Sequence, residues 1–274
     1  MVIKQSKALP SDILISVFAN LSFAERRLTI PLVCKHWRAI TQGPSPIWED
    51  CEIFHDSSSR KLALDRAQVI RWLGKHAEAV RQLKLCVNQD TRPGDWPQSV
   101  AGLVALMSNL QILELDAKGF FLAAKDMRAL SCLTSLRKMQ LRLGTSAEAF
   151  SQPAVTEPLR HLTALESLAF DLNVHSNSLQ LSEDLTHLNL KGLTYLELGS
   201  NGLSQLPFGP YLEQLQILDI TDNGTLEDVG CLAAATSLHT LALGEDAPVQ
   251  RSSLAALLPT DCVIVDDPLM IEDD

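Results

Sequence analysis

The fold is decided by one short stretch, Leu193-Thr194-Tyr195-Leu196-Glu197-Leu198-Gly199-Ser200-Asn201, with leucine at its first, fourth and sixth positions and asparagine at its ninth. The alternation Leu196-x-Leu198 predicts a short strand with one buried face, because successive strand side chains point to opposite sides. Asn201 can pair backbone groups where the chain leaves the strand, since its amide both donates and accepts. One such unit cannot bury its own apolar face, so the stretch requires copies of itself on either side.

Six further copies of the apolar-x-x-apolar-x-apolar pattern lie along the chain. They begin at Val80, Leu110, Leu136, Leu165, Leu215 and Leu238, so that successive copies lie 22 to 30 residues apart. Asparagine takes the same relative place at Asn88, Asn173 and Asn223. This is the signature of leucine-rich repeats. It predicts an α/β fold, a solenoid with a curved parallel sheet on one side and helices or turns on the convex side.

The repeat lengths predict different convex connections. The early, longer repeats have room for helices, which we expect at residues 98–108 and 124–130, and the later ones only for short turns. Leu185 also begins a matching pattern, but it lies only 8 residues before Leu193, too close for a neighbouring coil. We therefore place the strand within 193–201 and assign 181–190 to the convex side. Residues 260–265 predict a last strand, followed by a polar cap.

Residues 9–52 do not follow the repeat. Apolar side chains at helical spacing predict a first helix that Pro10 can open, with a stripe formed by Ile13, Leu14, Val17, Phe18 and Leu21. A second short helix is expected at 24–30 and a third at 32–40. Three short helices cannot hide this much apolar surface from water. The surplus predicts either a partner surface or packing against the first repeat, and the pattern leaves both open.

The motif Leu9-Pro10, Val17-Phe18, Val33-Cys34-Lys35-x-Trp37-Arg38 and a late Trp48 closely resembles the F-box. Followed by leucine-rich repeats, it resembles the F-box/leucine-rich repeat substrate receptors. The resemblance divides the chain into an F-box at 6–52, a helical linker and N-terminal cap at 53–79, and a solenoid of about seven repeats with a C-terminal cap at 80–274. In the linker, Ile70, Leu73, Ala77 and Val80 form a helical stripe.

The resemblance implies a substrate-recognition adaptor of a Skp–cullin–F-box E3 ubiquitin ligase. The F-box would bind a Skp-type adaptor, and through it a cullin–RING ligase, while the repeats hold a protein substrate. The chain itself would carry no catalytic residue, cofactor or metal. The residues that the resemblance assigns to adaptor binding, without separating them from the F-box core, are Leu9, Pro10, Ile13, Leu14, Val17, Phe18, Leu21, Val33, Cys34 and Trp37.

Strand residues that flank the inward leucines point to the concave face, which is the expected substrate face. The candidates are Lys84, Ile112, Lys138, Arg142, Asp171, Tyr195, Glu197, Ile217 and Asp219. Residues 1–142 have a net charge of +7 (20 basic against 13 acidic), and residues 143–274 a net charge of −17 (3 against 20). The polarity predicts a basic substrate segment at the C-terminal coils; a merely solubilising surface is the alternative.

Other classes of function find little support. A net charge of −10 disfavours a general nucleic-acid binder. Neither a signal peptide nor a long apolar run is evident, which predicts a cytoplasmic or nuclear protein without a membrane partner. The six cysteines predict reduced, mostly buried thiols, and neither Cys34 with His36 nor Cys51 with His55 offers enough ligands for zinc. Two alternatives stay open: a leucine-rich scaffold acting outside ubiquitin ligation, and repeats whose substrate site is completed by a small molecule.

Overall fold

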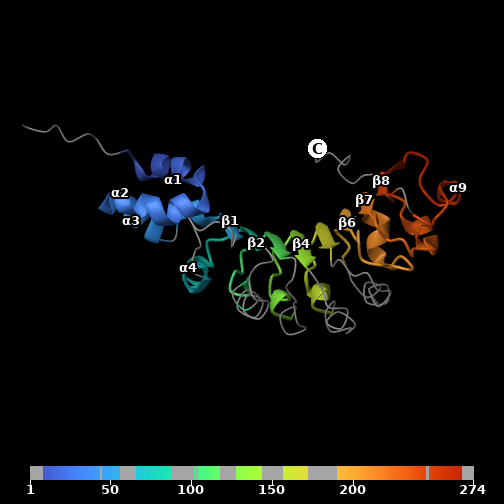
Figure 1. The fold of residues 1–274 in the computed structure, drawn as a ribbon, viewed down its shortest axis with the longest axis horizontal. Helices are drawn as coiled ribbons and strands as arrows, with labels where there is room; N and C mark the ends of the chain where they lie inside the picture. The colour runs from blue at the N-terminus through green and yellow to red at the C-terminus, as the bar shows by residue number, and fades with distance from the viewer. Residues whose placement is uncertain are drawn as a thin grey trace, which may run out of the picture.

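The computed structural model describes residues 9–43, 45–55, 66–87, 102, 104–117, 128–143, 157–171, 190–244 and 247–266. Its centre is one parallel sheet of nine strands in chain order. The strands are β1 (Asp50–His55), β2 (Gln82–Val87), β3 (Ile112–Ala117), β4 (Lys138–Leu143), β5 (Ser167–Asp171), β6 (Tyr195–Glu197), β7 (Ile217–Asp219), β8 (Thr240–Ala242) and β9 (Val263–Val265). The sheet curves, with its strands along the concave side (Figure 1). This confirms the predicted α/β solenoid.

The register explains how the repeat builds a continuous core. Equivalent leucines are direct neighbours on adjacent strands, as Leu113 is of Leu83 and Leu218 of Leu196. These side chains are all buried. Each added coil covers the apolar face of the one before, which a single repeat cannot do for itself.

Short helical segments connect the strands on the side away from the concave face. They include α4 (Arg66–His76), η4 (Glu157–His161), η5 (Pro210–Gln214), η6 (Gly230–Ala234) and α9 (Arg251–Leu254). A helix is present within the predicted linker as α4, but it ends at His76 and connects β1 to β2; Leu73 is buried on it, and Ala77 and Val80 are buried just after it. The predicted helices at 98–108 and 124–130 lie partly, and the 181–190 segment almost wholly, outside the described residues.

Two buried asparagines close the coils of β6 and β7, as the repeat pattern predicts. The Asn223 side chain accepts hydrogen bonds from the backbone N–H groups of Asn201 (3.2 Å) and Leu203 (2.9 Å). Its amide nitrogen donates to the carbonyl oxygens of Leu198 (2.9 Å) and Ile220 (3.0 Å). The amide nitrogen of Asn201 donates in the same way to the carbonyl oxygen of Phe170 (2.7 Å). Asn88 and Asn173 lie outside the described residues.

The N-terminal helices differ in detail from the predicted three. They are α1 (Ser11–Ala19), a wide π-type turn η1 (Glu25–Thr29), α2 (Ile30–Val33), α3 (Lys35–Gln42) and a short 3₁₀ turn η2 (Pro46–Trp48). The single helix expected at 32–40 is wrong, because the extended backbone of Cys34 separates α2 from α3. The Cys34 thiol instead caps α3 by accepting from the Trp37 N–H at 3.4 Å.

The sheet also begins one strand earlier than the repeat count predicts. Strand β1 pairs in parallel with β2, and Trp48, Cys51 and Ile53 are buried at the apolar positions of the pattern. The carbonyl oxygen of Glu49 accepts from Arg81 and Gln82, as that of Arg81 accepts from Gln111 and Ile112. The first coil of the solenoid therefore starts at Trp48, inside the helical region, although tryptophan and cysteine obscure the leucine pattern there.

Two other expectations concern the cysteines and membranes. The cysteines are all free, but only Cys51 is buried and Cys34 and Cys132 are exposed, so the prediction of mostly buried thiols is wrong. Burial raises the pKa of Cys51 to about 12, an effect that the nearby Arg26 partly offsets. Within the described parts of the chain, no helix has the length and apolarity that a membrane crossing requires.

Candidate functional site

An exposed group of aliphatic side chains lies on the N-terminal helices. We call Leu9, Ile13, Val17, Leu28, Leu32 and Val33 the helical apolar surface. They make up six of the nine large hydrophobic side chains that are exposed among the described residues. Val17 is 51% exposed and Leu32 77% exposed. Six large exposed apolar side chains within 25 residues of chain indicate an interaction site, since monomeric proteins usually scatter such residues singly.

The structure divides the ten residues assigned to adaptor binding into buried and exposed ones, a division that the sequence could not provide. Leu14 and Phe18 are buried, and the Phe18 ring packs edge-on against Trp37 at 4.9 Å between centroids. These two therefore form the core of the helical unit, with Leu21 and Trp37 half-buried against it. The residues left exposed are Leu9, Pro10, Ile13, Val17, Val33 and Cys34. On α1, the exposed Ile13 and Val17 are four residues apart and so share one helix face.

An aromatic cluster joins these helices to the solenoid. Phe23 and Trp48 both contact Trp72 of α4, with ring centroids 4.7 Å and 4.4 Å away, and His76 stacks at a tilt on Trp72 at 4.6 Å. We call these four rings and Arg26 the joint. Burial lowers the pKa of His76 to about 4, with a smaller contribution from Lys75, so the ring is neutral near pH 7.

Arg26 fixes the joint to the first strand. Its guanidinium is buried, lies over the Trp48 ring at 5.6 Å, and donates to the carbonyl oxygens of Ile47 and, at 2.8 Å, of Asp50. Burial lowers the pKa of this group. Because a buried cation without partners would be costly, the bonds to these carbonyls hold η1 against the start of β1. The helices and the sheet therefore share one packed core rather than a loose linker.

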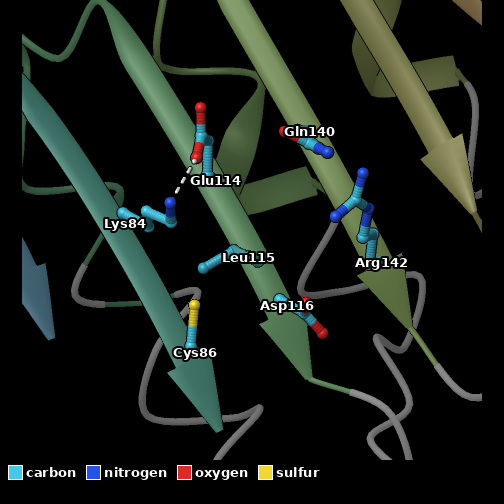
Figure 2. A pocket seen from close by; sticks show the side chains of 7 residues that line it. All are labelled: Lys84, Cys86, Glu114, Leu115, Asp116, Gln140 and Arg142. Carbon is cyan, nitrogen blue, oxygen red and sulfur yellow. Dashed lines mark ion pairs between the residues drawn. The ribbon is translucent and has the colours of Figure 1, made fainter. Parts of the chain in front are cut away.

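The concave face is the second candidate surface, and its N-terminal half is charged. A shallow pocket of about 190 Å³ lies across β2, β3 and β4, with Lys84 and Cys86 on β2, Glu114, Leu115 and Asp116 on β3, and Gln140 and Arg142 on β4 (Figure 2). Lys84 pairs with Glu52 (3.4 Å) and Glu114 (3.7 Å), and Lys138 pairs with Glu114 (3.1 Å). Cations and carboxylates here balance one another.

The C-terminal half of the concave face has a different character. Tyr195 and Ile217 are half-buried neighbours in register, and the Tyr195 hydroxyl donates to Glu197 at 3.1 Å. Arg142 reaches from β4 across the small Ala169 of β5 to Glu197 at 3.9 Å. The pKa of Glu197 is raised, first by burial and next by the carboxylate of Asp219.

Most of the predicted concave residues lie where the repeat places them. Lys84 is exposed, and Ile112, Lys138, Arg142, Asp171, Tyr195, Glu197 and Ile217 are half-buried. Asp219 departs from the expectation, since it is only 2% exposed. Its carboxylate accepts from the Thr221 backbone N–H (2.9 Å) and hydroxyl (2.8 Å). Strand β7 is only three residues long, so Asp219 serves the turn that follows it rather than an accessible surface.

Metal-ligating side chains do not gather in the described residues. There, no group of three or more histidine, cysteine, aspartate or glutamate side chains could hold a metal ion. The burial that raises the pKa of Cys51 also makes its thiol a poor nucleophile.

Comparison with known families identifies the helical region. Residues 7–51 match the model of the F-box-like family. The chain is an F-box-like domain followed by a solenoid of leucine-rich repeats. The match ends at Cys51, inside β1, so the F-box and the first coil of the sheet overlap in sequence.

Solved structures that resemble the chain share little of its sequence. An internalin from Listeria monocytogenes is 18% identical with a TM-score of 0.44, and the match covers 80% of this chain and 56% of the internalin. A leucine-rich repeat protein of Leptospira interrogans is 15% identical with a TM-score of 0.28, covering 71% and 74%. The leucine-rich repeat domain of the type III effector XopL is 15% identical with a TM-score of 0.36, covering 98% and 99%. The chain thus spans little more than half of the internalin. No curated protein matches it.

Proposed function

We propose that the chain is the substrate-recognition adaptor of a Skp–cullin–F-box ubiquitin ligase, which performs no chemistry of its own. An F-box implies binding of a Skp-type adaptor, and residues 7–51 match this family. The observation that carries the proposal is the helical apolar surface, which lies within the matched F-box and is not covered by the described chain. A Skp-type adaptor that buries these aliphatic side chains would gain free energy from their transfer out of water.

The joint suits this role because it links the two binding ends. The F-box helices pack on Trp48 and Trp72, and Trp48 itself opens the first coil of the solenoid. A substrate held by the repeats would therefore sit at a fixed distance from the ligase, which raises its effective concentration near the ubiquitin carrier. A scaffold acting outside ubiquitin ligation would need no such fixed geometry.

The test is co-purification of the full chain with a Skp-type adaptor and a cullin. The double substitution Ile13→Asp with Val17→Asp places two carboxylates on the exposed face of α1 and should reduce adaptor capture by at least about a hundredfold, since each buried charge is left unpaired. Leu106→Asp, at a residue that is 59% exposed on the solenoid, is the matched control and should leave capture unchanged. Adaptor capture that survives the double substitution would refute the proposed binding surface.

A second variant tests the joint. Trp72→Ala removes the ring that contacts both Phe23 and Trp48, and Trp72 is only half-buried, so the substitution loosens the joint without opening the centre of the core. We expect adaptor capture to persist while ubiquitin transfer to a substrate tethered to the repeats falls several-fold. Unchanged transfer would show that the joint has no positioning role.

A further inference from the structure

The concave face has both cations and carboxylates on β1 to β4, but only carboxylates on β5 to β9. Strands β1 to β4 carry the cations Lys84, Lys138 and Arg142, and each pairs with a carboxylate. Strands β5 to β9 carry the half-buried carboxylates of Asp171 and Glu197 and the buried one of Asp219, and no lysine or arginine. One cation from outside, Arg142, reaches Glu197, and at 3.9 Å the pair is long. The C-terminal half of the face is therefore acidic where the N-terminal half is balanced.

An apolar row crosses the same strands. Tyr195, Ile217, Thr240 and Val263 are successive partners in register on β6, β7, β8 and β9. The first three are half-buried and Val263 is 58% exposed. Because neighbouring strands lie about 4.8 Å apart, the row is about 15 Å long, which an extended chain covers in about five residues. Glu197 borders the row, held there by the hydrogen bond from Tyr195.

We propose that the concave surface of β5 to β9 binds an extended segment of a partner protein in which lysine or arginine alternates with aliphatic residues. The inference rests on the proposed function and names the class of substrate that the repeats select. An extended segment can lay its aliphatic side chains on the row, and the long, flexible side chains of lysine or arginine between them can bend back to the carboxylates of Asp171 and Glu197 on β5 and β6. Complementary charge then selects against acidic partners.

The charge of Glu197 agrees with this occupant. The carboxylate is already in a setting that disfavours its ionised form, through burial and the neighbouring Asp219. A cation brought close to it offsets that cost, whereas a neutral or acidic partner does not. Asp222 adds a further exposed carboxylate just beyond β7, at a backbone φ of 56° that aspartate and asparagine adopt more readily than most residues.

The experiment measures fluorescence anisotropy of labelled synthetic peptides titrated with the full chain. The probe is a peptide of four Val-Lys repeats, and the comparison peptides are four Val-Glu repeats and four Gly-Lys repeats. We expect the Val-Lys peptide to bind with an affinity that falls as salt rises, the Gly-Lys peptide to bind at least about fivefold more weakly, and the Val-Glu peptide not to bind. Binding of the Val-Glu peptide as tightly as the Val-Lys peptide overturns the inference, as does the absence of Val-Lys binding at millimolar concentration.

Matched variants locate the binding. Asp171→Asn with Glu197→Gln removes two charges with little change of shape and should weaken the Val-Lys peptide by about tenfold, while Asp222→Asn keeps the backbone preference and should weaken it less. Glu213→Gln, an exposed carboxylate on η5, is the control and should have no effect. Equal binding by the double variant and the control overturns the inference, and adaptor capture by these variants shows whether the proposed function stands apart from it.

A second copy of the chain is the competing occupant, since its N-terminal half has a net positive charge. Sedimentation of the full chain without peptide distinguishes self-association from binding of a partner segment. We expect a monomer; a dimer that the double variant dissolves would assign the face to self-association and overturn the inference.

Discussion

The N-terminal and C-terminal coils of the solenoid follow one repeat but are stabilised differently. The coils of β2 to β4 carry exposed ion pairs on their concave side, such as Lys84 with Glu52 and Lys138 with Glu114. The coils of β6 and β7 instead bury Asn201 and Asn223, whose amides pair the backbone of the neighbouring coil. Exposed pairs contribute little to stability, whereas a buried amide with satisfied partners is costly to remove. Among the described residues, exposed ion pairs therefore join the coils of one half and buried amide hydrogen bonds those of the other.

Among the substitutions that test this comparison, Asn223→Ala is expected to lower the unfolding free energy most. The substitution leaves the buried N–H groups of Asn201 and Leu203 and the carbonyl oxygens of Leu198 and Ile220 without their partner. We expect the C-terminal coils to lose about 3 kcal/mol or more of unfolding free energy. Urea unfolding followed by hydrogen exchange in β6 and β7 measures it.

The control for this substitution is Asn109→Ala. Asn109 also bridges two coils, through a 2.9 Å hydrogen bond to the Glu78 carbonyl oxygen, but it is exposed. We expect a loss below about 1 kcal/mol. Equal losses at Asn109 and Asn223 would remove the distinction between the halves.

The repeat predicts the strands well because a strand needs only its apolar spacing. Each of the eight predicted strands is present, including β9 near the C-terminal end. The sequence does not reveal β1, since Trp48, Cys51 and Ile53 satisfy the spacing with residues other than leucine and overlap the F-box motif. A search that also admitted tryptophan and cysteine at that spacing would have found it.

The surfaces are harder to predict than the strands, because exposure depends on neighbouring coils. The α1 stripe indicates apolar residues, but only packing against Trp37 shows that Phe18 is buried and Val17 exposed. Asp219 has the spacing of a concave residue, yet the turn after β7 takes its carboxylate. Arg142 contacts Glu197 two strands away because Ala169 lies between them, a relation that no single repeat contains.

A smaller effect is expected from pH at Glu197. The folded pKa of Glu197 is raised above its ordinary value of 4.5, so its contribution to stability is fully present below that value and is lost as the pH rises through the folded pKa. Glu197→Gln should therefore melt at a higher temperature than the unmodified chain at pH 7, and the difference should vanish below about pH 4. Thermal unfolding followed by circular dichroism across this range checks both. If the variant is instead less stable at pH 7, the attraction between Glu197 and Arg142 outweighs the cost of burying the Glu197 charge near Asp219.

The smallest effect is expected from Lys84→Met in the N-terminal half. Lys84 bridges Glu52 and Glu114 across three strands, but its side chain is 45% exposed, so water screens both pairs. Loss of the ammonium also leaves Lys138 as a partner for Glu114 at 3.1 Å. We expect a loss of at most about 1 kcal/mol in urea unfolding, smaller still at high salt. A loss as large as that of Asn223→Ala, persisting at high salt, would show that the charges across β1 to β4 act as a cooperative network, so that the two halves would differ in chemistry but not in strength.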